Sequence, residues 1–187
     1  MYRIRLASPD DAAELLALQH KLDSQSSFML LEPGERAQEP DRLRTSLQAQ
    51  DSTASFDLIS SDEKSGDAVG WLSVEVPPFR RARHAGYLVI GVDAAAAGRG
   101  IGHDLLAAAE REASSRGLRR LELTVMTDNL RAVGLYLRSG FQVEGLRRHA
   151  IIRDGAPVDE YYLGKLLPQQ DGADESDIAE ETVTGVT

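Results

Sequence analysis

The sequence has no cysteine and no long hydrophobic run, and each absence excludes a class of protein. Without cysteine there can be no disulfide, no thiolate nucleophile and no cysteine-based metal site. No apolar run approaches the roughly 18 residues that a membrane-spanning helix needs. Residues 1–6 also lack the apolar core of a signal peptide. We therefore expect a cytoplasmic protein with no membrane partner.

The chain is also short of basic charge, because 21 Lys and Arg stand against 30 Asp and Glu and the formal net charge is −9. This acidity argues against nucleic acid as a partner, since phosphate binding needs a basic face. It suits a cationic amine substrate. Residues 168–187 contain six acidic residues and no Lys or Arg, which predicts a solvated, disordered acidic tail. Residues 1–167 suit one domain with a full hydrophobic core.

Hydrophobic periodicity divides residues 1–167 into strands and helices. Leucines recur at helical spacing at Leu15, Leu18 and Leu22, whereas apolar and polar residues alternate near Leu121 as in a half-buried strand. The expected strands cover residues 2–6, 55–60, 67–76, 84–92, 121–126, 141–153 and 156–166. The expected helices cover a segment that begins at Ser8-Pro9, about 40–50, 101 to Gly117, and 129–138.

Two further features indicate how these elements are arranged. Residues 87–92 are apolar on both faces, which predicts a central strand buried on both sides. Asp154-Gly155 is a strong hairpin signal between the last two strands. The order of elements implies an α/β fold of the α+β type, with a mixed central sheet of about seven strands and about four helices on both faces, in three layers.

The segment with the clearest chemistry is Gly98-Arg99-Gly100-Ile101-Gly102, which joins the central strand to a helix. Glycines permit positive φ and let backbone N–H groups approach a ligand closely. A helix N-terminus adds unpaired donors and partial positive charge, and Arg99 adds a mobile full charge. The turn is therefore expected to bind a phosphate or pyrophosphate. The alternative is a plain glycine-rich turn without a ligand.

Two other phosphate-binding motifs fit this turn poorly. A dinucleotide fingerprint needs a sixth-position glycine where this chain has His103. A P-loop needs Gly-Lys-Ser/Thr, which is absent. Both motifs also follow the first strand of a parallel unit, whereas this turn follows about four strands.

Two segments carry a resemblance to a known family. Residues 97–102 resemble the acetyl-CoA motif of the GCN5-related N-acetyltransferases (GNAT family), Gln/Arg-x-x-Gly-x-Gly/Ala. Residues 129–141 resemble the family pattern Asn-x-x-Ala-x-x-Leu-Tyr-x-Lys-x-Gly-Phe, with Arg138 in place of Lys. The resemblance extends through Glu144-Gly145 to residues 158–162 and covers essentially residues 1–167. One departure is Ala97, which stands where the family usually has Gln or Arg.

The resemblance implies the GNAT fold and acetyl-CoA as co-substrate. Asn129 would bind the arm of acetyl-CoA and Tyr136 would protonate the departing thiolate, a general-acid role worth roughly 10²–10⁴ in rate. The alternatives are that Asn129 caps a helix and that Tyr136 only packs. The expected acetyl-CoA-binding residues are Ile90 and Val92 through their main chains, Ala97, Gly98, Arg99, Gly100, Ile101, Gly102, His103, Asn129, Ala132, Tyr136 and Arg138.

The acceptor amine must lose a proton before it attacks, so a base or a water chain is required. Some relatives have a Glu where this chain has Thr124, and Glu122, two residues earlier, is the candidate base. Glu35, in a loop that resembles an acceptor-lining segment, and Tyr162 are candidate substrate-binding residues. The four histidines have no metal-ligand spacing, so no metal site is expected.

The sequence thus predicts an acetyl-CoA-dependent N-acetyltransferase that acts on the primary amine of a small molecule, with amino acids among the acceptors. The reaction would be a direct attack in a ternary complex. The alternatives are acetylation of protein N-termini or lysines, and a regulatory domain that binds CoA without turnover. Homodimers are common in the family that the chain resembles, and the sequence leaves the oligomeric state open.

Overall fold

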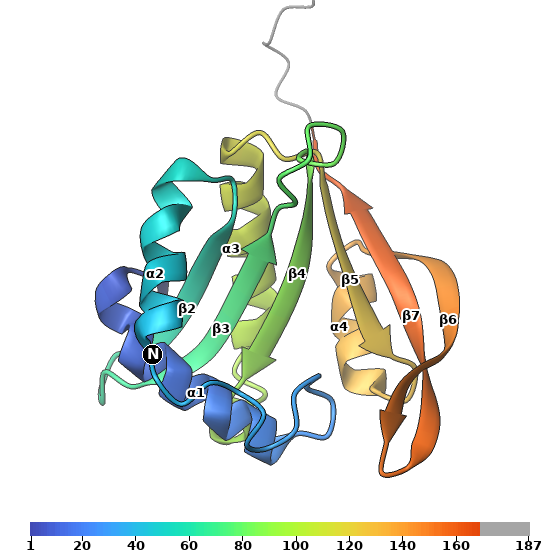
Figure 1. Cartoon of the computed structure of the whole chain (residues 1–187), viewed down its shortest axis with the longest axis horizontal. Coiled ribbons are helices and arrows are strands. Elements are labelled where there is room, and N and C mark those ends of the chain that lie inside the picture. The colour runs from blue at the N-terminus through green and yellow to red at the C-terminus, as the bar shows by residue number, and fades with distance from the viewer. Residues whose placement is uncertain (169–187) are drawn as a thin grey trace, which may run out of the picture.

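The computed structural model describes residues 1–168, in which one twisted sheet carries helices on both faces (Figure 1). The strands are β1 (Tyr2–Leu6), β2 (Phe56–Asp62), β3 (Ala68–Glu75), β4 (Ala85–Val92), β5 (Arg120–Met126), β6 (Gln142–Arg153) and β7 (Ala156–Leu166). The α-helices are α1 (Ala12–Gln25), α2 (Asp41–Ala49), α3 (Ile101–Ser115) and α4 (Leu130–Arg138). Short 3-10 turns cover Pro9–Asp11, Gln50–Ser52 and Ala94–Ala96. The predicted acidic tail, apart from Pro168, lies outside the described residues.

The sheet has the order β1-β2-β3-β4-β5-β7-β6. Every neighbouring pair is antiparallel except β4 and β5, which run parallel. The β6–β7 hairpin turns at Asp154 and Gly155, both of which have positive φ (52° and 76°), as the sequence predicts. The predicted mixed sheet of seven strands with four α-helices is confirmed.

Two hydrophobic clusters occupy the two faces of the sheet. On one face, α1 buries Leu15, Leu18 and Leu22 in a cluster with Ile59 and Trp71 of the sheet. On the other face, α3 buries its i, i+4 series at Ile101, Leu105, Ala109 and Ala113 in a cluster with β2 to β5. In Figure 1, α1 and α2 accordingly lie in front of the sheet and α3 and α4 lie behind it. The predicted three layers follow from these two faces.

The parallel strands separate soon after they meet. Only Ala85–Tyr87 of β4 pair with Arg120–Glu122 of β5, and no residue of β4 beyond Tyr87 pairs with β5. Tyr87 and Val89 lie on the other face of the sheet from Leu88 and Ile90, outside the cluster that α1 buries, and are 36% and 37% exposed. The prediction that this strand is buried on both faces is therefore wrong, because one face and one edge of its C-terminal half border an opening rather than a neighbouring element.

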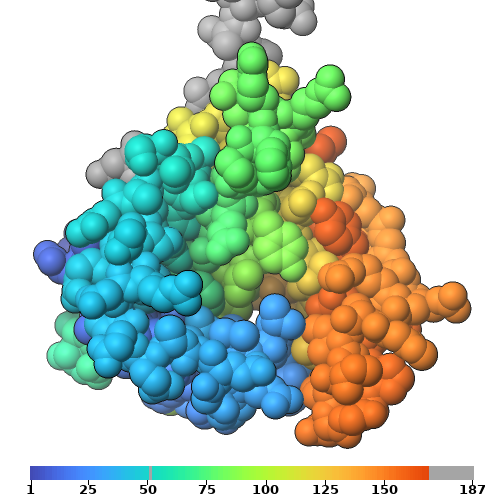
Figure 2. All heavy atoms as spheres, in the orientation of Figure 1, coloured from blue at the N-terminus to red at the C-terminus, as the bar shows by residue number. Residues whose placement is uncertain are grey.

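The opening is visible on the surface of the molecule. Figure 2 shows a gap between the N-terminal segment, in blue, and the β6–β7 hairpin, in orange.

Within residues 1–168, no helix is long and apolar enough to cross a bilayer.

Candidate functional site

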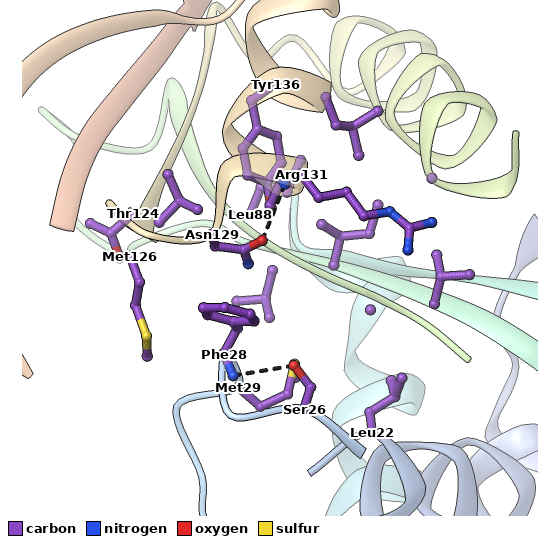
Figure 3. Close-up of a pocket in the computed structure, with 18 of the residues that line it drawn as sticks. Leu22, Ser26, Phe28, Met29, Leu88, Thr124, Met126, Asn129, Arg131 and Tyr136 are labelled. Atoms are coloured by element: carbon purple, nitrogen blue, oxygen red, sulfur yellow. Dashed lines mark hydrogen bonds between the residues drawn. The ribbon is translucent and has the colours of Figure 1, made fainter. Parts of the chain in front are cut away.

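A cavity of about 920 Å³ lies where β4 and β5 separate. Four parts of the chain line it: the segment after α1, the C-terminal half of β4 with the glycine turn, the end of β5 with α4, and the β6–β7 hairpin. Figure 3 shows Phe28 from the first of these facing Asn129, with Met126 to one side and Ser26 below. We call this cavity the cleft.

The glycine turn lies in the cleft with the geometry that the sequence predicts. Gly98 and Gly100 have φ values of 79° and 87°, and Gly100 is the N-cap of α3. A Cβ on Gly98 would meet nothing within 4 Å, whereas one on Gly102 would lie 3.2 Å from Leu135 Cδ2. The first N–H groups of α3 have no partner within the helix. The turn therefore offers free backbone donors and open space to an anion.

The carboxylate of Asp93 holds the entry to this turn in place. It accepts hydrogen bonds from the Ala95 N–H (3.0 Å) and from Gln25 Nε2 (3.2 Å), and it pairs with Lys21. Gln25 Oε1 in turn accepts from the Ala94 N–H at 3.1 Å. These contacts tie the turn to the end of α1 and fix its orientation before any ligand binds.

Arg99 lies elsewhere than expected. Its Nη1 is 2.9 Å from Asp62 Oδ2, and its Nη2 donates to the Met1 carbonyl at 3.4 Å. Its guanidinium also lies 5.7 Å from the centre of the Tyr2 ring. The side chain is thus held at the β1–β2 edge rather than in the cleft, because Asp62 provides a counter-charge there. The predicted mobile charge beside the turn is not present in this structure.

The backbone of β4 presents unpaired polar groups to the cleft. The Asp93 N–H donates to the Val69 carbonyl of the β3 side. Because successive backbone groups of a strand point to opposite edges, the N–H and C=O of Ile90 and Val92 point toward β5, where no ladder forms. The side chains of Ile90 and Val92 pack on the core. The main chains of Ile90 and Val92 are therefore available at this edge, and their contact with acetyl-CoA stays a prediction.

The α4 residues line the opposite wall of the cleft. Asn129 is the N-cap of α4, and its Oδ1 accepts from the Ala132 N–H at 3.2 Å. Asn129, Ala132 and Tyr136 all line the cleft, as do Arg138 and His103. Asn129 therefore does cap the helix through its side-chain oxygen. Its side-chain NH₂ remains free to face the cleft (Figure 3).

Tyr136 is buried between the cleft and the core. Its ring packs edge-to-face against Phe141, with 5.9 Å between the ring centres. Burial raises the pKa of Tyr136 well above the usual range, with a smaller contribution from Tyr87. Its hydroxyl makes no hydrogen bond to another described residue. The group therefore keeps its proton at neutral pH and remains available to a ligand.

Besides Arg99, three predicted residues do not line the cleft. Glu122 lies 2.7 Å from Arg120 Nε, and Arg120 also pairs with Glu144. Glu35 accepts a hydrogen bond from the Glu32 N–H at 2.8 Å, inside its own loop. Tyr162 lies on β7 opposite Thr124, and its pKa is raised by burial and then by Glu122. These residues could contact a substrate in the cleft only through water or after movement of the loop that contains Glu35.

The structure identifies individual side chains to which the sequence assigns no role. Phe28, Met29 and Leu30, in the loop that also contains Glu35, supply an apolar wall, and Glu160 with Arg147 supplies an ion pair. The Tyr87 hydroxyl lies 2.7 Å from Thr124 Oγ1, across the point where β4 and β5 separate. The family resemblance marked the loop and residues 158–162 as segments, without assigning these side chains. Among residues 1–168, no group of three or more His, Asp or Glu could hold a metal ion.

Comparison with known proteins gives a consistent result. A family model described as the Acetyltransferase (GNAT) family matches residues 20–141. The L-amino acid N-acetyltransferase AaaT of Escherichia coli K12 is 35% identical over 103 residues, which cover 54% of this chain and 63% of that protein. The chain thus spans less than two thirds of this relative's length.

Solved structures resemble the whole described fold. An acetyltransferase of the GNAT family from Streptococcus pneumoniae superposes with a TM-score of 0.85 at 30% identity, covering 90% of this chain and 100% of that one. The yncA acetyltransferase from Salmonella typhimurium, solved with its cofactor acetyl-CoA, superposes with a TM-score of 0.79 at 20% identity, covering 93% and 98%. The second of these shows similarity of fold alone.

Proposed function

The chain belongs to the GNAT family of acetyltransferases, and on that premise we propose that it transfers the acetyl group of acetyl-CoA to the primary amine of a small molecule, with amino acids as the acceptor class. One observation carries the proposal: the glycine turn, the unpaired edge of β4 and the Tyr136 hydroxyl line a single cleft. The amino-acid specificity named for the E. coli relative supports the choice of acceptor.

The residues of the cleft fit acetyl-CoA in two ways. The backbone N–H groups of residues 98–103 would hold the pyrophosphate at the N-terminus of α3. The free main chains of Ile90 and Val92 and the side-chain NH₂ of Asn129 would hold the amide-containing arm. Because Ala97 stands where the family usually has Gln or Arg, one side-chain contact to phosphate is missing. Binding of acetyl-CoA would therefore depend chiefly on the backbone.

Bound acetyl-CoA supplies a thioester carbonyl carbon as the electrophile and a thiolate as the leaving group. The Val92 N–H, which points to the unpaired edge of β4, would stabilise negative charge on the thioester oxygen, a contribution of about 3–4 kcal/mol when well aligned. Tyr136 holds a proton on its hydroxyl, because burial raises its pKa, and can donate it to a sulfur anion.

The acceptor amine, with a pKa near 10, must release its proton before attack. Glu122 would receive that proton only through water, because it lies outside the cleft and is paired with Arg120. The ammonium loses one proton to solvent, and the nitrogen loses a second proton as the amide forms. The thiolate gains one proton, so the reaction releases one proton in all.

The proposal is tested by mixing the protein with acetyl-CoA and a panel of amino acids, polyamines, peptides and aminoglycosides, and following the release of free thiol. We expect amino acids to support the fastest release, and CoA alone to raise the unfolding temperature. Fastest release with peptides would favour acetylation of protein N-termini or lysines. Stabilisation by CoA without turnover would favour a regulatory domain, and no stabilisation at saturating CoA would overturn the proposal.

A further inference from the structure

We propose that Glu160 and Arg147 form an acceptor subsite that binds the zwitterionic head of an α-amino acid with an apolar side chain. Glu160 binds the ammonium group and Arg147 binds the carboxylate. The inference rests on the proposed function and narrows its acceptor class.

Glu160 is a buried carboxylate at the wall of the cleft. It lies on β7 between Met126 of β5 and Arg147 of β6, and its side chain is only 8% exposed. Its Oε2 lies 2.7 Å from Arg147 Nη1, whereas Oε1 accepts no hydrogen bond from any residue in 1–168. This oxygen is not sealed from solvent, since it is not among the fully buried atoms that lack a partner, and it is open to a donor that enters the cleft. An incoming ammonium group is such a donor.

Arg147 completes the subsite from the neighbouring strand. Its side chain is 53% exposed and bonds Glu160 through Nη1 alone. The other guanidinium nitrogens make no hydrogen bond within the described part of the chain. The planar guanidinium binds carboxylates through paired N–H donors. A single carbon joins the two charges of an α-amino acid, so its receptor groups must be neighbours, as Glu160 and Arg147 are.

An apolar wall lies beside this ion pair. The Arg153 guanidinium lies 5.3 Å from the centre of the Phe28 ring, and its Nη1 lies 3.4 Å from Met126 Sδ. Phe28 and Met126 therefore both lie within reach of one guanidinium, and Met126 is directly opposite Glu160. Asp128 neutralises Arg153. An amino acid held at Glu160 would thus place its side chain against Phe28 and Met126, which favours an apolar one.

This arrangement separates amino acids from other amines. A peptide N-terminus and an amino-acid amide have an ammonium group but no α-carboxylate, so they would leave Arg147 without its ligand. A polyamine would lack both the carboxylate and the apolar side chain. Arg147 is therefore a specificity-determining residue, and Glu160 is a binding residue for all α-amines.

The test compares L-phenylalanine with L-phenylalaninamide, in rate and in binding to the CoA-saturated protein, where no turnover occurs. Because a hydrogen bond to a charged group contributes about 1.5–3 kcal/mol, we expect Arg147→Gln to lower the acid-to-amide ratio of kcat/KM about tenfold or more. Because Arg147 also bonds Glu160, the substitution can change both rates, so the ratio rather than either rate is the readout. Comparing ratios between variants cancels the difference in amine basicity between the two compounds.

Arg148→Gln is the matched control, because Arg148 is the next residue on the strand, is exposed and does not line the cleft. It should leave the ratio unchanged. Glu160→Gln keeps the side-chain volume and should weaken calorimetric binding of acid and amide alike, about tenfold. If Glu160→Gln fails to fold, the Arg147→Gln ratio decides alone.

An Arg147→Gln ratio equal to that of wild type, with amines still acetylated, would overturn the subsite and leave the proposed function standing. An absence of thiol release with every amine would instead contradict the proposed function itself. Loss of the acid preference in Arg147→Gln, without loss in Arg148→Gln, supports the subsite.

Discussion

The two ends of the cleft are built in different ways. The end proposed to bind acetyl-CoA, called the donor end, consists of residues 98–103 with Ile90 and Val92 and offers main-chain groups that the fold fixes in place. The end proposed to bind the amine, called the acceptor end, consists of Phe28, Met126, Arg147 and Glu160 and offers side chains from three separate segments. Substitutions at the donor end should change CoA affinity only where they change the backbone conformation. At the acceptor end, each side chain should affect which amine is accepted.

The largest effect is expected where the two ends meet, at Tyr136. Tyr136→Phe removes only the hydroxyl and keeps the ring that packs on Phe141. We expect kcat to fall roughly 10²–10⁴-fold, the range for loss of a general acid, with CoA affinity within about twofold of wild type. Steady-state kinetics and calorimetric titration of CoA measure the two quantities.

The pH dependence of this variant provides a control. Burial raises the pKa of Tyr136, so the protonated form persists to higher pH than for an ordinary tyrosine of pKa about 10. The ratio of wild-type to variant kcat should therefore stay constant from about pH 6 to 9. A ratio that falls as pH rises through this range would show that the hydroxyl titrates there, contrary to this account.

The next largest effect is expected from a backbone change at the donor end. Gly100 has φ of 87°, and a residue with a Cβ in the left-handed region costs about 1–2 kcal/mol. Gly100→Val should weaken CoA binding about tenfold, since each 1.4 kcal/mol is a factor of ten. Calorimetry measures the dissociation constant.

Gly117→Val is the matched control at the other end of α3, where φ is 77° and a Cβ meets nothing within 4 Å. It should lower stability to a similar extent while CoA affinity stays unchanged. Equal losses of CoA affinity in both variants would mean that helix stability, rather than the shape of the turn, determines binding.

A smaller effect is expected at the apolar wall of the acceptor end. Phe28→Ala removes the ring that contacts Arg153, an interaction worth about 0.5–1 kcal/mol at an exposed site. We expect KM for the acceptor to rise about threefold without a change in CoA affinity. Phe79→Ala, an exposed phenylalanine that does not line the cleft, should leave both unchanged.

The smallest effect is expected at Arg99, despite its place in the glycine turn. Its side chain is paired with Asp62, and a partly exposed ion pair contributes about 0–1 kcal/mol. Arg99→Gln should change CoA affinity by less than about twofold in the titration used for Gly100→Val. A tenfold loss would mean that Arg99 leaves Asp62 and contacts the phosphates.

Local patterns predicted the donor end well. The spacing of Gly98 and Gly100 before a helix, and the i, i+4 series that begins at Ile101, depend on backbone conformation and periodicity within one segment. The turn at Asp154-Gly155 is equally local. Such features can be read from neighbouring residues alone.

The acceptor end depends on contacts between distant segments, so the sequence predicted only the loop that contains Glu35 and residues 158–162, and not the individual side chains that meet there. Glu160 faces the cleft because of its register with Met126 and Arg147, and the β6–β7 register shifts between Arg147 and Ile151. Arg99 turns away because Asp62 happens to lie beside it. The prediction that β4 is buried on both faces was wrong, because an apolar face of a strand can line a cleft as readily as a core.

The most direct test of the central claim is a crystal structure of the protein with CoA bound. This account predicts that the pyrophosphate contacts the backbone N–H groups of residues 98–103 and that the thiol lies between β4 and β5, within reach of the Tyr136 hydroxyl. A pyrophosphate bound away from the glycine turn, or a thiol distant from Tyr136, would contradict it.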